Sequence, residues 1–300
     1  IFAGISVLGG SVNVGTTTGN TIGSATTTGA ITVTSTVTAS LTEGIYVSAP
    51  GATIDVRNNN VGGITASSAT AAVGFVVRGI ETTGASANVT LTGNTVGSTT
   101  AANSIQVGIS GTTTAVTTFV GIQNGATGTN SITNNTIQND SVFGTGASIF
   151  QGISNAGIGT LTVTGNLVTA GTSRGTGTSQ GIVSSAPATT VNVNNNTVRG
   201  MIWNPNTTSA FRAIEVSGAV TAAININDNA LGDATAGLIT YGTTATGGTL
   251  YGINANGGAA TANLSIQRND FRGVTHSGTV GAIEIDCFFA NSSASGLTQT

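Results

Sequence analysis

Leu161-Thr-Val-Thr-Gly-Asn-Leu-Val168 is a short segment whose pattern returns along the whole chain. Apolar residues alternate with threonines, which is typical of a β-strand with one buried face. Gly165-Asn166 predicts a sharp corner, because Gly and Asn enter left-handed backbone conformations at the least cost. A second short apolar segment follows the corner. The segment therefore predicts a strand, a corner and another strand.

Near-copies of this segment show that the chain is built from repeats. The clearest copies begin at Ile54, Val89, Val191, Ile224 and Leu264. Looser copies contain the corner residues Asn20 and Asn135. A pattern that continues over the whole sequence favours one elongated body over several domains. We therefore interpret residues 1–300 as one continuous repeat domain.

A small residue followed by Ile precedes each corner. These pairs are Gly4-Ile5, Gly44-Ile45, Gly79-Ile80, Gly121-Ile122, Gly152-Ile153, Gly181-Ile182, Ala213-Ile214, Gly252-Ile253 and Ala282-Ile283. The distance from a pair to the next corner Asn is 14–17 residues, whereas the distance from that Asn to the next pair is 13–27 residues. A nearly constant arm holding three strands, followed by a variable surface loop, is one turn of a parallel β-helix. The prediction is an all-β solenoid, a single-stranded right-handed parallel β-helix with eight to nine coils and three parallel sheets.

The Gly-Ile strand, the Val-x-Val strand and the Asn corner resemble the right-handed parallel β-helices of the pectate-lyase-like group. That resemblance implies an asparagine ladder, in which corner side chains of successive coils bond to one another. The ladder residues would be Asn20, Asn59, Asn94, Asn135, Asn166, Asn196, Asn229 and Asn269. The Thr-, Asn- and Gly-rich composition without lysine also resembles giant repetitive surface proteins of bacteria, including gliding-type adhesins. Both resemblances together imply an extracellular protein on a bacterial cell surface.

Composition excludes several classes of protein. Charged residues make up 6% of the chain and the net charge is −3, which argues against nucleic acid as a partner. Apolar residues make up 38% and are regularly spaced, so the chain can bury a core. The single cysteine, Cys287, rules out an intrachain disulfide. No apolar run is long enough for membrane insertion. Because the chain starts within a repeat and without Met, we expect a fragment of a larger protein.

Three carboxylates are the catalytic candidates. The position after each Ile would face outward on the first strand, where pectate-lyase-like enzymes act, and Glu215 and Glu284 occupy it. Two coils would separate them by roughly 10 Å, at the outer edge of the spacing in inverting glycosidases. Glu284 and Asp286 would face the same way on one strand, with Arg212 as a substrate clamp. The alternative is that these carboxylates are only solvated groups on an exposed strand.

Other candidate sites are few. Trp203 is the best candidate for an exposed aromatic that contacts a sugar or a protein, and a buried Trp covering the rod is the alternative. Tyr46 is a second candidate contact, at an outward position. The long variable arms, residues 20–44, 94–121 and 229–252, are the expected contact surfaces. His276 lacks carboxylate neighbours in sequence, and we expect no metal site and no cofactor.

These observations favour a structural or adhesive protein, part of a bacterial cell-surface fibre or adhesin that contacts a surface or a glycan. The expected partners are further coils or subunits of the same protein at the ends of the rod, together with surface polysaccharide. Two alternatives remain open. One is a polysaccharide lyase or glycoside hydrolase that acts on the first-strand face, and the other is a non-catalytic carbohydrate-binding module.

Overall fold

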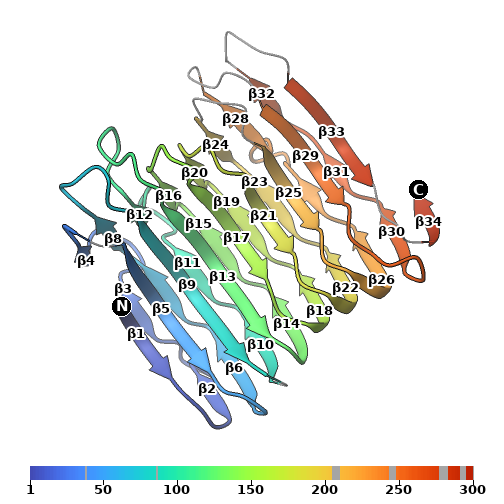
Figure 1. Cartoon of the computed structure of the whole chain (residues 1–300), viewed down its shortest axis with the longest axis horizontal. Helices are drawn as coiled ribbons and strands as arrows, with labels where there is room; N and C mark the ends of the chain where they lie inside the picture. Colours follow the sequence, from blue (N-terminus) through green and yellow to red (C-terminus); the bar gives the residue numbers. More distant parts are fainter. Residues whose placement is uncertain are drawn as a thin grey trace.

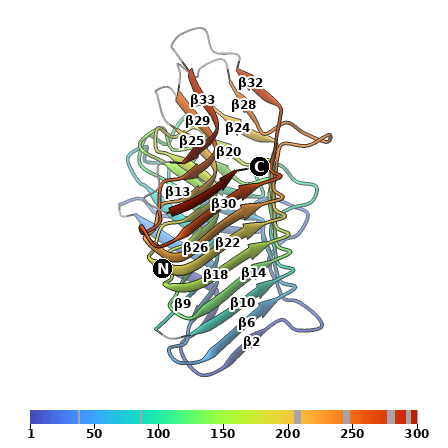
Figure 2. The same ribbon diagram turned by 90° about the vertical axis from the view of Figure 1, so that its right-hand side faces the viewer.

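The computed structural model shows a parallel β-helix whose coils stack in sequence order along one axis (Figure 1). It describes all residues except 38, 86, 205–209, 243–247, 277–282, 291–294 and 300. Every strand pairing found among the described residues is parallel and joins successive coils (Figure 2). In the same residues, no helix has the length and hydrophobicity needed to cross a membrane.

Four sheets line the coil. Sheet A contains β1 (Phe2–Val7), β5 (Ser40–Ser48), β9 (Phe75–Gly84), β13 (Thr118–Ala126), β17 (Ile149–Asn155), β21 (Ser179–Ser184), β25 (Phe211–Val216), β29 (Gly248–Ala255) and β33 (Ile283–Ala290). Sheet B contains β2 (Val12–Val14), β6 (Thr53–Arg57), β10 (Asn88–Thr92), β14 (Thr129–Thr133), β18 (Gly159–Thr164), β22 (Ala188–Asn194), β26 (Val220–Asn227), β30 (Asn263–Gln267) and β34 (Ser295–Gln299).

The other two sheets are built from shorter strands. Sheet C contains β3 (Thr21–Gly23), β7 (Asn60–Gly62), β11 (Thr95–Gly97), β15 (Thr136–Gln138), β19 (Leu167–Thr169), β23 (Thr197–Arg199), β27 (Ala230–Leu231) and β31 (Asp270–Phe271). Sheet D contains β4 (Ile31–Thr34), β8 (Ile64–Ser67), β12 (Ile105–Val107), β16 (Ser141–Val142), β20 (Thr172–Ser173), β24 (Met201–Trp203), β28 (Ile239–Tyr241) and β32 (Val274–His276).

The predicted parallel β-helix is confirmed, but the predicted number of three sheets is wrong. Sheet D lies in the arm that the sequence suggested was only a surface loop. Its strands are as short as two residues, too short to display an alternating pattern. Each strand of sheet D from β8 to β28 bonds to its counterparts in the coils on either side, so pairing between coils compensates for the weak local signal.

The core follows the predicted strand pattern. In sheet B the alternating apolar residues point inward, and pairs such as Ile54 and Val56 are fully buried. The small residue before each Ile has a packing reason. An added Cβ at Gly121 would lie 2.8 Å from Ile137 Cγ1 of sheet C, too close for a carbon–carbon contact. Glycine at this position therefore lets sheets A and C approach closely.

The asparagine ladder is continuous through all eight corners. The Nδ2 group of each Asn donates to Oδ1 of the Asn in the next coil at 2.8–3.1 Å. The backbone N–H of the same residue donates to that Oδ1 at 2.9–3.0 Å. Nδ2 also donates to a carbonyl of the preceding coil, as from Asn94 to Val56. The ladder thus satisfies polar groups that would otherwise be buried without partners.

The residue before the ladder Asn shapes the corner. From the second coil onward it has a positive φ of 51–70°, the left-handed conformation expected for Gly165. The seven residues are Asn58, Gly93, Asn134, Gly165, Asn195, Asp228 and Arg268. Gly, Asn and Asp enter this conformation at low cost, which explains their prevalence here.

A second, shorter ladder lies inside the coil two residues after the core Ile. Thr82 Oγ1 bonds to Asn124 Oδ1 at 3.0 Å, and Asn124 Nδ2 donates to Asn155 Oδ1 at 2.7 Å. Asn155 continues the row to the hydroxyl of Ser184 at 3.4 Å. This ladder has no clear signal in the sequence, because its members are of three residue types and recur in only four coils.

The last small-Ile pair predicted from the sequence is wrong. Ile283 pairs with Gly248, whereas Phe288 pairs with the core residue Ile253. Cys287-Phe288 therefore takes the position that we assigned to Ala282-Ile283, five residues further along the chain. This register moves every residue of β33 relative to the columns of sheet A.

Candidate functional site

Two columns of polar side chains run along the outer face of sheet A, on which pectate-lyase-like enzymes act by the resemblance above. The first column holds the residue after each core Ile: Ser6, Tyr46, Glu81, Gln123, Ser154, Val183, Glu215, Asn254 and Phe289. The second column holds the residue two positions before each core Ile, or before Phe288 in β33. These residues are Ala3, Glu43, Arg78, Val120, Gln151, Gln180, Arg212, Tyr251 and Asp286.

The Glu43 cluster consists of Glu43, Arg78 and Glu81 on neighbouring strands β5 and β9. Arg78 Nη1 lies 2.6 Å from Glu81 Oε2 and 3.7 Å from Glu43 Oε1. Both carboxylates are almost completely buried, with Glu43 4% exposed. Burial and a hydrogen bond to Glu81 raise the pKa of Glu43 to about 7, although Arg78 opposes the shift. Glu43 therefore keeps its proton below neutral pH and is hydrogen-bonded to Glu81.

A pocket of about 310 Å³ opens beside this cluster. Tyr46, the predicted contact residue, lines it together with Glu43, Arg78 and Glu81. Ile1 and Leu8 add apolar surface to its rim. The pocket thus combines a carboxyl group that titrates near neutral pH, a guanidinium group and a half-buried phenol ring.

The Glu215 cluster consists of Gln180, Arg212 and Glu215 and occupies the same two columns four coils later. Arg212 forms an ion pair with Glu215, three residues along the strand. Gln180 Nε2 donates to Glu215 Oε2 at 3.0 Å, and Gln180 Oε1 accepts from Gln151 Nε2 at 3.0 Å. Glu215 is 4% exposed, so its carboxylate is held by the protein and hardly reaches solvent.

The register of β33 separates two of the predicted carboxylates from Glu215. In this register, Glu284 lies opposite Thr249 and Asp286 lies opposite Tyr251. Asp286 is therefore two coils and three residues away from Glu215 in the paired sheet, about 14 Å between backbone positions. Glu284 is further away still, so neither residue has the spacing of roughly 5–10 Å from Glu215 that glycosidase carboxylates show. Glu284 and Asp286 lie two residues apart on β33, and their role as a catalytic pair stays a prediction.

The other predicted contact residue is in the core. Trp203 is 1% exposed, and its ring packs against Phe211 with centroids 5.8 Å apart. The alternative of a buried Trp is therefore the one observed, and Trp203 offers no surface to a ligand. His276 packs against Tyr241 at 5.4 Å, and Cys287 is exposed on β33. Among the described residues, no three His, Cys, Asp or Glu side chains are close enough to hold a metal ion.

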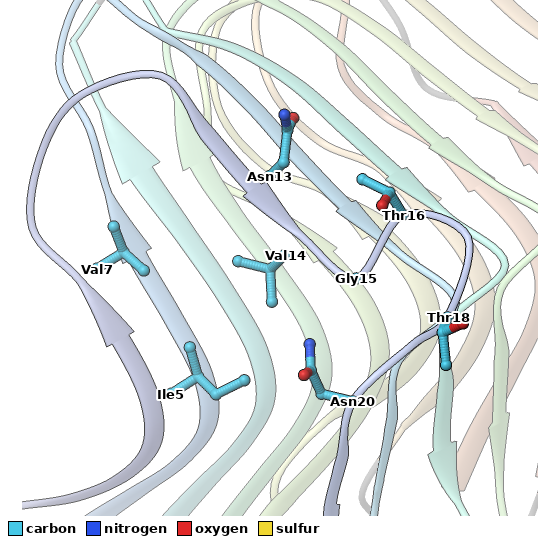
Figure 3. A pocket seen from close by; sticks show the side chains of 8 residues that line it. All are labelled: Ile5, Val7, Asn13, Val14, Gly15, Thr16, Thr18 and Asn20. Atoms are coloured by element: carbon cyan, nitrogen blue, oxygen red, sulfur yellow. The ribbon is translucent and has the colours of Figure 1, made fainter.

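The first coil leaves the interior of the β-helix open at one end. Ile5, Val7, Val14 and Asn20 point into a pocket of about 580 Å³ at this end (Figure 3). In later coils the equivalent Ile and Val residues are fully buried, as Ile45 and Val47 are. The lining of this pocket is therefore the cross-section of a β-helix core.

Glu215 and Tyr46 were predicted as site residues from their positions. Glu43 and Arg78, which lie beside Tyr46, and Gln180, which bonds to Glu215, were not predicted. One signal was present: Arg78-Gly-Ile-Glu81 and Arg212-Ala-Ile-Glu215 share an Arg-x-x-Glu pattern around the core Ile. The third member of each cluster lies about one coil away in the chain, where only the register identifies it. No known protein family, no curated protein and no solved structure matches the chain.

Proposed function

We propose that the chain is a structural and adhesive segment of an extracellular bacterial cell-surface fibre, in which further coils of the same protein stack on its ends. The observation that carries the proposal is the polarity of the asparagine ladder. Each Oδ1 from Asn59 onward accepts two hydrogen bonds from the preceding coil. All hydrogen bonds from one ladder Asn to another point in the same direction along the rod.

This polarity makes the two ends complementary. In the described part of the chain, Asn20 Oδ1 receives no donor. Asn269 retains the backbone N–H and the second Nδ2 hydrogen that its predecessors donate onward. An acceptor at one end and donors at the other favour head-to-tail stacking, and such an interface extends into an open filament.

Apolar surface at both ends supports stacking. The 580 Å³ pocket at the first coil is lined by Ile5, which is only partly buried, and reaches Val14. At the other end Ile285 is 47% exposed and Phe288 is 36% exposed, although Phe288 occupies the core Ile position. A further coil would bury these side chains and pair the free strand edges, which otherwise invite association. The Thr- and Asn-rich composition supports the extracellular surface location.

Stacking is tested with the purified chain and one variant at the open end. We expect filaments in electron micrographs and a sedimentation coefficient that rises with concentration. Val14→Arg places a charge in the opening and should leave monomers, whereas Thr17→Arg, an exposed substitution in the same coil, should not. Circular dichroism of both variants verifies the fold.

Two results would overturn this proposal. The first is a chain that stays monomeric at every concentration, and the second is filament formation that Val14→Arg does not alter. For the location, immunolabelling of intact producing cells should detect the protein at the surface. Detection only after lysis would contradict the extracellular role.

A second candidate function, a polysaccharide lyase or hydrolase, is favoured by one observation. Glu43 lies in a pocket on the face of sheet A and is hydrogen-bonded to Glu81, and a carboxyl group with a pKa of about 7 is suited to acid–base catalysis. Their direct hydrogen bond places them closer together than a glycosidase pair, which weakens the hydrolase version.

Activity assays on acidic and neutral polysaccharides separate the two functions. Turnover that Glu43→Gln abolishes would replace the structural proposal with an enzymatic one. Glu284→Ala together with Asp286→Ala tests the carboxylates that the sequence indicated, and we expect no turnover for these variants or for the unmodified chain.

A further inference from the structure

Arg174 differs from the other arginines of the chain. Six of the seven arginines form ion pairs with Asp or Glu. Arg174 has no carboxylate within ion-pair distance in the described part of the chain. Its guanidinium lies over the ring of Phe143 instead, 5.5 Å from the centroid. A cation held on an aromatic face keeps its charge and most of its donors available.

A pocket of about 530 Å³ opens beside Arg174 on the outer face of sheet D. Its walls come from four successive coils, β12, β16, β20 and β24 with the residues that follow them. Four adjacent strands span about 14 Å, and the volume lies within the usual range for small-molecule sites.

The remaining lining is uncharged and mostly polar, with Ile109, Phe143 and Ile202 as its apolar residues. Gln106, Thr172 and Asn204 contribute amide and hydroxyl groups. Phe143 and Ile202 contribute apolar surface, and Ile202 is 44% exposed. With no acidic side chain in the lining, the charge of Arg174 is not compensated. The pocket therefore favours an anionic ligand that also carries hydroxyl groups.

The strands around the pocket restrict how a ligand can bind. Each of β12, β16, β20 and β24 is hydrogen-bonded to neighbours on both sides, so no free backbone edge is available. An extended peptide, which binds to sheets mainly through backbone hydrogen bonds, would lack its usual partner. A ligand recognised by side chains alone fits better.

We propose that this pocket binds a saccharide that carries a carboxylate. The guanidinium of Arg174 would bind the carboxylate through two parallel hydrogen bonds. Gln106, Thr172 and Asn204 would bond to ring hydroxyls, and Phe143 and Ile202 would contact the apolar face of the sugar. The site extends the adhesive role proposed above, but its geometry does not depend on stacking of the rod.

The experiment measures the affinity of the Val14→Arg chain for defined oligosaccharides by titration calorimetry. The probes are a uronic-acid trisaccharide, its neutral hexose counterpart, an acidic peptide and inorganic sulfate. We expect the uronic-acid probe to bind at least about tenfold more tightly than the other three. Using the non-stacking variant separates this site from the proposed function, because binding should persist when filaments do not form.

Variants then locate the binding site. Arg174→Gln should weaken binding of the uronic-acid trisaccharide by about tenfold or more, and Arg174→Lys should restore only part of it, because lysine lacks the planar fork. Arg57→Gln, an exposed arginine on sheet B, is the matched control and should change nothing. The proposal is overturned if the uronic-acid probe does not bind, if the peptide or sulfate binds as tightly, or if Arg174→Gln leaves the affinity unchanged.

Discussion

The Glu43 cluster and the Glu215 cluster occupy the same columns of sheet A and differ in the residues on either side of the arginine. Both contain an arginine paired with a glutamate three residues later. In the preceding coil, Glu43 faces Arg78, whereas the amide Gln180 faces Arg212. In the following coil, Arg78 has Val120 as its neighbour and Arg212 has Tyr251.

This difference shows how the neighbouring coil changes the chemistry of a position that recurs in the repeat. The carboxylate of Glu43 beside Glu81 would add negative charge, and the raised pKa of Glu43 lets it keep its proton up to about pH 7. An amide at the same position donates a hydrogen bond to Glu215 and adds no charge. One residue in the adjacent coil thus decides whether the cluster titrates near neutral pH or forms a neutral network around one ion pair.

The largest expected effect comes from removing each arginine. Arg212→Met leaves Glu215 buried without a cation and should lower the free energy of unfolding by about 2–4 kcal/mol. Arg78→Met should cost less at pH 5 than at pH 8, because Glu43 is protonated at the lower pH and needs no cation. Urea unfolding at both pH values measures the losses. An Arg78→Met loss that is the same at both pH values would contradict the raised pKa of Glu43.

Glu43→Gln converts the first cluster into the arrangement of the second. The folded chain holds a proton on Glu43 that the unfolded chain releases above about pH 4.5, so stability falls as the pH rises from about 4.5 to about 7. Above pH 7 this loss is complete. Glu43→Gln removes it and should stabilise the protein at pH 8 by about 1–3 kcal/mol.

The measurement is the difference in unfolding free energy between pH 5 and pH 8 for the variant and the unmodified chain. Glu284→Gln, which removes an exposed carboxylate elsewhere on sheet A, serves as the control and should leave that difference unchanged. An unaltered difference in Glu43→Gln would show that another group causes the pH dependence.

The reverse substitution, Gln180→Glu, should install the first arrangement in the second cluster. The new carboxyl group would lie beside Glu215, and the like charge would raise its pKa. We expect a loss of about 1–2 kcal/mol at pH 8 that is largely recovered at pH 5. Thermal unfolding at the two pH values tests this, and Gln151→Glu, one coil further from Glu215, should show a smaller change.

The smallest expected effect concerns the contact between Arg212 of the second cluster and the ring of Tyr251. Arg212 lies 5.7 Å from the ring centroid of Tyr251. Tyr251→Leu keeps apolar bulk and removes this contact, so it should cost about 0.5–1 kcal/mol in urea unfolding. In an Arg212→Met background the same substitution should cost less. Equal costs in both backgrounds would show that the ring does not act through Arg212.

Part of the fold could be predicted because it repeats. The eight ladder asparagines, the corner residues and the inward columns of sheet B recur often enough to be recognised, and each has a single physical role. Sheet D could not be predicted, since strands such as Ser141–Val142 carry no periodic pattern. The site was predicted only in part: Glu215 and Tyr46 were found by position, but their partners come from other coils.

The sequence by itself determined the coil, because corner asparagines, small residues and alternating apolar residues act locally and recur in every turn. Only the tertiary structure decided the register of β33, the burial of Trp203 and the neighbours of each charge. The reason is that stacking of the coils brings together residues that lie some 30–40 positions apart in the sequence. Arg174 illustrates the limit: it is one of seven arginines in the sequence, and only the packing of successive coils leaves it without an acidic partner.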